Sequence, residues 1–272
     1  MRSLVVRRAS LAASAAALAV LATACGGSSG SGDKGGDGKT AQADKTASAA
    51  PSQTVSAGPA AAKALSAAEL EKAALTQADV KSGKLVTKVP AQDDIAQSKA
   101  KTDEAACAPL AYLQVGTYVG TPSATVKREW TGDARKPAAG ASAEDTAFAA
   151  LNRAKVLVTL ASYEDGGAAK AFADLRTAST KCAGGFAFTV GSDKTKVDKV
   201  AVTAPPQGAD EALALTSLVD ADEGIKAPVK GVVVRKGATL AYFPAVNLAA
   251  AATGKDFDFP TEIVEAQLAK LG

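Results

Sequence analysis

Residues 163–186, YEDGGAAKAFADLRTASTKCAGGF, decide the fold predicted for this chain. They predict a helix that Asp165 caps at its start and that Gly184-Gly185 ends. The residues that recur at helical spacing are Ala168, Phe172, Leu175, Ser179 and Cys182. The apolar run at 155–163 predicts a buried strand before the helix, and residues 186–190 predict a strand after it.

Short strands separated by turns account for most of the remaining domain. Further strands are predicted at residues 84–89, 124–130, 197–203, 212–219, 229–235 and 239–243. Residues 90–102 and 132–143 are predicted to be loops. Because short turns favour antiparallel pairing, we predict an α+β fold, a single domain with an antiparallel sheet and helices packed on one face.

Three further helices flank these strands. Residues 66–69, Ser-Ala-Ala-Glu, form a capping box and predict a helix over 67–75. A second helix carries Cys107 and continues through Leu113, with Pro109 in its first turn. The last helix opens at Asp258 and Pro260. The residues on one face of this helix are Val264, Leu268 and Leu271.

The first 24 residues have the order of a secretory signal peptide. Arg2, Arg7 and Arg8 give a positive start, and an apolar run over 11–24 follows. This run is shorter than the roughly 20 residues that a spanning helix needs, so we expect the segment to be removed rather than to stay in the membrane.

Leu21-Ala22-Thr23-Ala24-Cys25 resembles a bacterial lipoprotein box, in which the cysteine carries diacylglycerol and becomes the new N-terminus. Ala22 departs from the bulky aliphatic residue usual at that position. The resemblance implies a lipidated Cys25, a membrane partner through the lipid anchor, and a location on the extracytoplasmic face of the cell membrane. The alternative is a plainly secreted protein that is cleaved after Ala22-Thr23-Ala24.

Three segments are therefore expected. They are a lipoprotein signal peptide at 1–24, the lipidated Cys25 with a disordered Gly/Ser/Ala tether at 25–62, and an α+β sensor-like domain at 63–272. The chain has 31 basic and 28 acidic residues, and the signal peptide accounts for three of the arginines. The mature chain is therefore neutral, and we expect no nucleic-acid partner.

Cys107 and Cys182 remain after lipidation of Cys25. In an oxidising compartment we predict that they form a disulfide. The alternative is two buried free thiols. A redox or metal site is not expected, because the sequence has no Cys-x-x-Cys motif and no histidine.

The capped first helix, the segment CAPLAYL at 107–113, the stretch 158–186 and the terminal IVEAQLAKL at 263–271 together resemble the PknH-like extracellular domain family. This resemblance covers residues 64–272. It implies an antiparallel sheet with flanking helices around a cleft, and a role in sensing or in binding a small ligand. Two departures are noted: this sequence contains no kinase or transmembrane helix, and it allows one domain disulfide where family members often have two.

Catalytic motifs are missing from the sequence. Zero histidines exclude Ser-His-Asp and Cys-His chemistry, and no GxSxG, Walker-type or dinucleotide motif is present. The carboxylate clusters are Asp93-Asp94, Asp220-Asp222-Glu223 and Asp256-Asp258. We interpret them as solvated turns rather than a carboxylate active site. No enzyme activity, cofactor or metal is expected.

Trp130 and Tyr163 are the candidate ligand-binding residues, because amphipathic aromatic side chains often line clefts. The alternative is that both fill the core between sheet and helices. The predicted function is a non-enzymatic sensor or ligand-binding lipoprotein, with an unknown small molecule or cell-envelope component as its partner. The alternatives are a solute-binding lipoprotein of a transporter and a carboxylate-based cell-wall hydrolase.

Overall fold

Nine strands form one antiparallel sheet in the computed structural model, which describes residues 62–221 and 224–272. The strands are β1 (Lys84–Val86), β2 (Ala100–Thr102), β3 (Ala124–Thr131), β4 (Ala154–Ser162), β5 (Phe186–Val190), β6 (Asp193–Thr203), β7 (Glu211–Asp220), β8 (Lys226–Lys236) and β9 (Thr239–Asn247). Their order across the sheet is β1-β3-β4-β9-β8-β7-β6-β5-β2. Every neighbouring pair is antiparallel, which confirms the predicted fold class.

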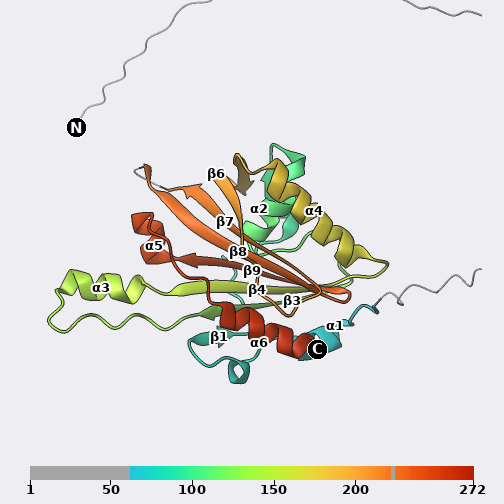
Figure 1. Ribbon diagram of the computed structural model, residues 1–272, viewed down its shortest axis with the longest axis horizontal. Coiled ribbons are helices and arrows are strands. Elements are labelled where there is room, and N and C mark those ends of the chain that lie inside the picture. The colour runs from blue at the N-terminus through green and yellow to red at the C-terminus, as the bar shows by residue number, and fades with distance from the viewer. Residues whose placement is uncertain (1–61, 222–223) are drawn as a thin grey trace, which may run out of the picture. The chain divides into compact units, whose positions relative to one another are not determined.

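Six helices complete the described part of the chain. They are α1 (Ala67–Ala73), α2 (Ala108–Gln114), α3 (Ala143–Leu151), α4 (Gly167–Lys181), α5 (Leu248–Thr253) and α6 (Thr261–Leu271). Three short 3-10 turns, η1 (Gln77–Asp79), η2 (Gln97–Lys99) and η3 (Ala105–Cys107), lie between β1, β2 and their neighbouring helices. In Figure 1, α2 and α4 lie on one side of the twisted sheet, and α1 and α6 lie on the other.

Helices thus cover both faces of the sheet, whereas the sequence pattern predicts one face. The reason is visible in the central strands β8 and β9, which are apolar at consecutive positions. Val233 and Tyr242 point into the core beneath α2 and α4, while Val232 and Phe243 point into the core beneath α1 and α6. Strands buried on both faces have continuous apolar runs rather than alternation.

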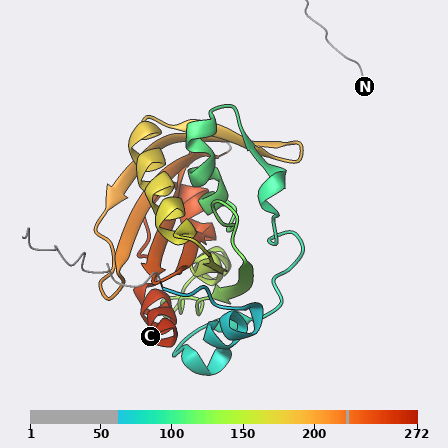
Figure 2. The same cartoon turned by 90° about the vertical axis from the view of Figure 1, so that its right-hand side faces the viewer.

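The two cores are named by their helices. In the α2–α4 core, Phe172 and Leu175 of α4 pack on Tyr242, and all three side chains are almost fully buried. In Figure 2, α2 and α4 lie side by side in front of the sheet. In the α1–α6 core, Leu70 and Ile263 pack among strand residues. Each such buried side chain contributes about 1.5–3 kcal/mol relative to an exposed one.

The stretch at 163–186 begins directly after β4, forms the helix α4 and leads into β5, so the predicted order of strand, helix and strand is confirmed. The cap of α4 differs from the prediction. Gly166 is the N-cap residue and makes no side-chain cap hydrogen bond. Asp165 precedes it in the left-handed region with φ 51°, a conformation that short polar residues tolerate better than most. The chain reverses at this point through backbone geometry rather than through a carboxylate cap.

Several predicted segments lie outside the described residues. These are the signal peptide at 1–24, Cys25 and nearly all of the tether, together with the acidic residues Asp222 and Glu223. Among the residues that are described, no helix is long and apolar enough to cross a membrane.

Candidate functional site

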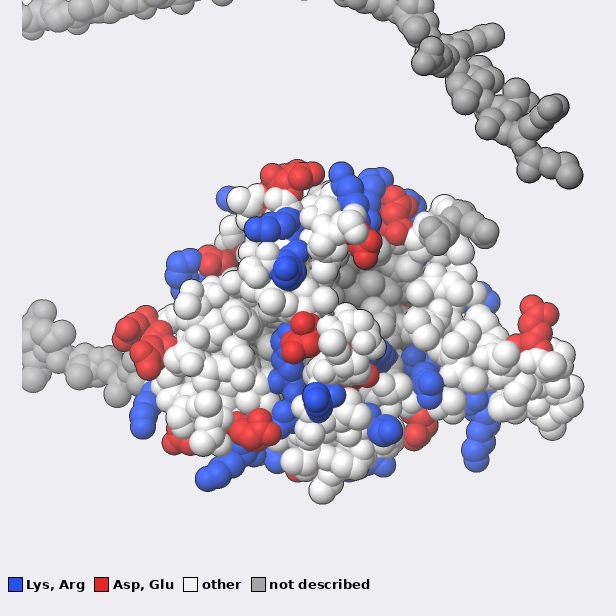
Figure 3. Space-filling view, turned by 180° about the vertical axis from the view of Figure 1, so that it is seen from behind, with Lys and Arg blue, Asp and Glu red and all other residues white. Residues whose placement is uncertain are grey.

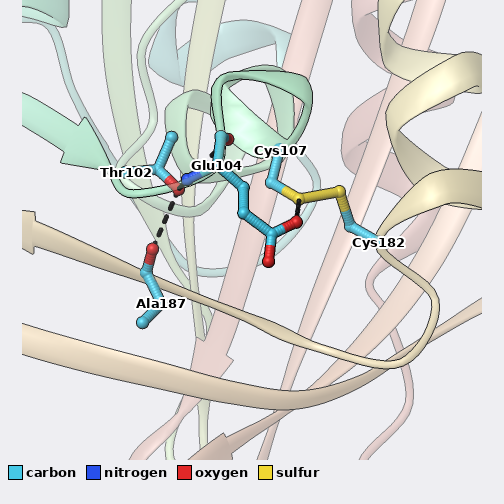
Figure 4. Close-up of a disulfide and its surroundings, with 5 residues drawn as sticks. All are labelled: Thr102, Glu104, Cys107, Cys182 and Ala187. Atoms are coloured by element: carbon cyan, nitrogen blue, oxygen red, sulfur yellow. Dashed lines mark hydrogen bonds between the residues drawn. A yellow bond between two sulfur atoms is a disulfide. The ribbon is translucent and has the colours of Figure 1, made fainter. Parts of the chain in front are cut away.

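A disulfide joins the start of α2 to the end of α4 on one face of the sheet. Cys107 precedes α2 and Cys182 follows α4, and their Cα atoms lie 5.9 Å apart (Figure 4). Beside it, the Thr102 hydroxyl donates to the carbonyl oxygen of Ala187 at 2.9 Å, which holds the short strand β2 on β5. The predicted pair is therefore present in the structure, and it fixes the layer formed by α2 and α4.

The structure does not bring the two candidate aromatic residues together. Trp130 is 3% exposed and belongs to the α1–α6 core, where its indole N–H donates to the Ser82 carbonyl oxygen at 2.8 Å. Tyr163 is 2% exposed and belongs to the α2–α4 core on the opposite face. Both side chains fill cores, and Trp130 alone borders a cavity.

Tyr163 is part of a buried hydrogen-bond network. Its hydroxyl donates to the Val119 carbonyl oxygen at 2.7 Å and lies 2.8 Å from the Tyr242 hydroxyl. The Val119 N–H donates to the Tyr242 oxygen at 3.2 Å. Burial raises the pKa of the Tyr163 hydroxyl and raises the pKa of Tyr242 to about 12. Both phenols stay neutral at ordinary pH, and they hold the loop after α2 against the sheet.

A cleft of about 670 Å³ opens where β3 and β9 end and β4 begins, and we call it the polar cleft. Its walls come from α3, α5 and the segment that joins α5 to α6. The residues that supply its charged and aromatic surface are Trp130, Asp133, Arg135, Phe148, Arg153, Lys255, Asp256, Phe257, Asp258 and Glu262. Its volume lies in the usual range for ligand sites, about 300–1,000 Å³.

Two glycines allow the backbone to approach the Trp130 ring closely at the edge of the polar cleft. A Cβ atom on Gly132 would lie 2.9 Å from the indole ring, and one on Gly83 would lie 2.7 Å from its nitrogen. Gly83 also has φ +72°, a region that favours glycine. The indole is therefore fixed in place, and it forms a rigid part of the floor rather than a mobile contact.

The charges in the polar cleft are only partly paired. Among the residues that the structure describes, Arg135, Arg153 and Lys255 form no ion pair. Asp256 pairs with Lys230 at 3.0 Å, and this contact lowers the pKa of Asp256. Within the described residues, Asp133, Asp258 and Glu262 form no ion pair either. The cleft therefore presents cationic donors beside free carboxylates, next to the half-exposed ring of Phe148.

A second cavity, of about 360 Å³, lies on the opposite face of the sheet. We call it the strap pocket, because the segment 87–96, the strap, lies over it. Its apolar walls are Ile95, Val115, Leu157, Pro244, Val246 and Leu248, and its polar residues are Gln92, Asp93, Gln114 and Lys155. Alternate residues of a strand point to opposite faces. Lys155 and Leu157 therefore face this pocket, while Val156 between them faces the α1–α6 core.

The strap is the segment 87–96, which leaves β1 at the sheet edge and crosses over β3 and β4. Two lysines of those strands hold it. Lys127 pairs with Asp94 at 2.8 Å and donates to the Ile95 carbonyl oxygen at 3.0 Å. Lys155 pairs with Asp93 at 2.8 Å and with Glu129 at 3.3 Å. Burial acts to lower the pKa of Lys155, but these two carboxylates outweigh it and the pKa is raised.

The acidic turns singled out in the sequence each contact lysine. Asp220 and Asp198 form a cluster with Lys196 and Lys226 across β6, β7 and β8. Hydrogen bonds from these lysines lower the pKa of both aspartates. Within the described residues no group of three or more Cys, Asp or Glu side chains is arranged to hold a metal ion. The face shown in Figure 3 carries basic and acidic side chains interspersed.

No family model matches the sequence, and the comparison with curated proteins finds no match. Among solved structures, the chain is similar to the extracellular domain of PknH from Mycobacterium tuberculosis, with a TM-score of 0.42 and 12% identity over 77% of this chain and 95% of that one. It is also similar to an uncharacterised Mycobacterium smegmatis protein, the Rv0999 ortholog, with a TM-score of 0.30 and 14% identity over 69% of this chain and 80% of that one. The structural relation is distant. The function is therefore inferred from the residues of this chain.

Most of the polar cleft is not predicted by the sequence pattern, which indicates a loop at residues 132–143 and no helix at the positions of α3 and α5. Two capping signals were present. The Ser142 hydroxyl accepts from the Asp145 N–H at 3.0 Å at the start of α3. The Asn247 side chain accepts from the Ala250 N–H at 3.1 Å at the start of α5. Neither helix carries an apolar stripe that would have made the signal stronger.

Proposed function

We propose that this protein is a lipid-anchored, extracytoplasmic binding protein without enzymatic activity, and that the polar cleft is its ligand site. The ligand class that fits is a small polar molecule or a cell-envelope fragment with an anionic group and a flat or apolar part. It would place its anion near Arg135, Arg153 and Lys255 and its apolar part against Phe148.

The polar cleft is the observation that carries this proposal. Its arginines and its lysine supply hydrogen-bond donors that no described carboxylate uses. Arginine is well suited to bind carboxylate or phosphate, because its planar group donates two parallel hydrogen bonds. Trp130, held by its bond to Ser82, gives the cleft a rigid floor and lowers the ordering cost of binding.

The extracytoplasmic location rests on two separate features. Cys25 lies in a lipoprotein-box sequence, and two acyl chains would give stable membrane attachment. The Cys107–Cys182 disulfide is typical of proteins that fold in an oxidising compartment. The first feature lies outside the described residues, so the anchor remains part of the proposal.

Two other functions fit less well. A transporter-type solute-binding protein needs two lobes with a hinge, whereas the described residues form one domain around a single sheet. A carboxylate-based hydrolase needs free acids at a set spacing. The aspartates 93, 94, 220 and 256 each pair with a lysine, which leaves Asp133, Asp258 and Glu262 in the cleft as the acids to test.

Native mass spectrometry of the purified protein, with co-purifying molecules retained, tests the binding proposal. We expect a bound small molecule, and we expect Arg153→Ala combined with Lys255→Ala to reduce its retention. Arg176→Ala combined with Lys181→Ala, at two exposed positions of α4, is the matched control and should retain the ligand. Equal retention by all variants would place the ligand elsewhere.

Incubation with peptidoglycan fragments tests the enzymatic alternative. The binding proposal predicts no turnover. Product formation that is abolished by Asp133→Asn, Asp258→Asn or Glu262→Gln would replace it with a hydrolase.

A further inference from the structure

The strap pocket has the composition of a site for an apolar chain. Its walls are aliphatic side chains from the strap, α2, β4, β9 and α5, and it shares no lining residue with the polar cleft. Leu248 at its rim is 56% exposed, so an apolar chain bound in the pocket would cover it and remove apolar surface from water. Gly116 lets the chain after α2 pass over Leu157, because a Cβ atom there would lie 2.5 Å from a Leu157 methyl carbon.

One end of the strap pocket carries an excess of negative charge. Asp93 and Glu129 share the single ammonium of Lys155, and their side chains are 23% and 11% exposed. Asp93 Oδ2 and Glu129 Oε2 are buried, and neither accepts a well-aligned hydrogen bond from the described residues. Both of these oxygens face the one Lys155 ammonium, so two negative charges are balanced by a single positive charge. An additional cationic donor at this end would therefore be stabilised.

Among the described residues, no further positive charge pairs with these two carboxylates to balance this excess of negative charge. The nearest further pair on the strap, Lys127 with Asp94, is itself neutral. The remaining polar lining residues are Gln92 and Gln114, which are uncharged. Asp93 and Lys155 line the pocket, and Glu129 lies against Lys155 just outside the lining. These three groups together give the apolar pocket an end of net charge about −1.

We propose that the strap pocket binds an amphipathic molecule with a short apolar chain and a protonated primary amine, which lies under the strap with its amine at Asp93 and Glu129. The chain packs on Val246, Leu157 and Leu248. This site is independent of the polar cleft, on the other face of the sheet, and does not depend on what binds there.

Three probes of equal chain length test the proposal: octylamine, octanol and octanoate. They are titrated at neutral pH into the full chain carrying Cys25→Ser, which keeps the protein's own lipid out of the measurement. Backbone amide shifts in NMR spectra report the site. We expect shifts at Val115, Leu157 and Val246 with affinities in the order amine, alcohol, carboxylate, and the amine about tenfold tighter than the alcohol.

Two variants separate the contributions of charge and chain. Glu129→Gln should remove the preference for octylamine over octanol while it leaves octanol binding unchanged. Its control is Asp174→Asn on α4, which changes the net charge equally at a distance. Leu248→Ser should weaken all three probes, and its control is Leu151→Ser, which changes a leucine of α3 that is similarly exposed.

Two results would overturn the proposal. One is octanoate binding as tightly as octylamine to the protein with both carboxylates intact. The other is the absence of amide shifts at the pocket residues with every probe. Both the probe affinities and the amide shifts are measured on the Cys25→Ser chain without further substitutions. These two tests therefore do not depend on whether Glu129→Gln folds.

Discussion

Arg128 shows how one side chain of β3 connects the sheet to its neighbours. Arg128 is only 5% exposed. Its guanidinium donates to the Leu75 carbonyl oxygen at 3.1 Å and to the Lys127 carbonyl oxygen at 2.9 Å. Its remaining nitrogen pairs with Glu71 of α1. The fork of donors, rather than the charge alone, satisfies two carbonyl groups and a carboxylate together.

Arg128→Lys keeps the charge but cannot reach all three acceptors. We expect the free energy of unfolding to fall by about 1–3 kcal/mol, because at least one buried carbonyl loses its donor. Urea denaturation measures the change. Arg176→Lys, at an exposed position of α4, is the control and should stay within about 0.5 kcal/mol of the parent chain. An equal, small effect of both changes would contradict this role.

The hydroxyl of Tyr242 is expected to stabilise the fold through its hydrogen bond in the core. Tyr242→Phe keeps the ring but leaves the Val119 N–H without its acceptor in the core. We expect a loss of about 1–3 kcal/mol in thermal or urea unfolding. Tyr112→Phe is the control, since its hydroxyl makes no hydrogen bond within the described residues, and it should change little. Equal stability of the two variants would show that the network is not needed.

At the scale of elements, the turn after α1 is tied to α6. Asp79 accepts from Lys270 of α6 at 2.9 Å and from the Thr76 N–H and hydroxyl at 2.7 Å each. The Lys270 contact, followed by the Thr76 bonds, lowers the pKa of Asp79 from its ordinary 3.8 to about 2. The pair joins the 3-10 turn η1 to α6, and its two residues are 191 positions apart in the chain.

Asp79→Asn should therefore have a pH-dependent effect. A lowered folded-state pKa stabilises the fold above about pH 4, and this stabilisation is lost as the pH falls from about 4 to 2. The shift corresponds to at most about 2 kcal/mol, and partial solvent exposure of the pair reduces this to about 1 kcal/mol. At pH 7 the free energy of unfolding of Asp79→Asn should be lower than that of the parent chain by this amount. At pH 2 the difference between the two chains should be smaller. A difference that is constant with pH would refute the linkage.

The disulfide constrains the layer of α2 and α4. It closes a loop with a sequence separation of 75 residues. Replacement of both Cys107 and Cys182 by alanine should lower the free energy of unfolding by about 4 kcal/mol in the chain-entropy model. Urea unfolding of the double variant measures this, with the dithiothreitol-treated parent chain as a second reference. An undiminished stability in both samples would contradict it.

Elements with a strong pattern were predictable from the sequence. The capping box before α1 is present in the structure, with Ser66 and Glu69 bonded as predicted. The strand β5 has the predicted bounds at both ends. α3 was missed because none of its residues is buried, so it has no apolar stripe to detect. α5 was missed because six residues of mostly alanine give no period.

Candidate site residues were harder to predict than elements. Trp130 and Tyr163 were chosen by residue type, and their separation onto opposite faces depends on register across β3, β4 and β9. The strap pocket depends on Asp93 meeting Lys155 from a segment 62 residues away, which no local pattern encodes. The covering of both faces was readable from the apolar runs of β8 and β9, but alternation in the outer strands favoured one face.

At the scale of the whole molecule, the sheet separates two cavities of different chemistry. One face holds the polar cleft with its cationic donors, and the other holds the strap pocket with its acidic end. Basic and acidic side chains are interspersed on the face shown in Figure 3, in keeping with a chain of 31 basic and 28 acidic residues. The proposed attachment to a membrane therefore depends on the lipid of Cys25 rather than on a basic surface.

The intact mass of the protein recovered from the membrane fraction of a lipoprotein-processing bacterium tests this account most directly. We predict a chain that begins at Cys25 and carries a diacylglycerol group, and we predict that Cys25→Ser releases the protein into the medium. A chain whose Cys25 is an unmodified thiol, or a Cys25→Ser chain that stays with the membrane, would contradict the account.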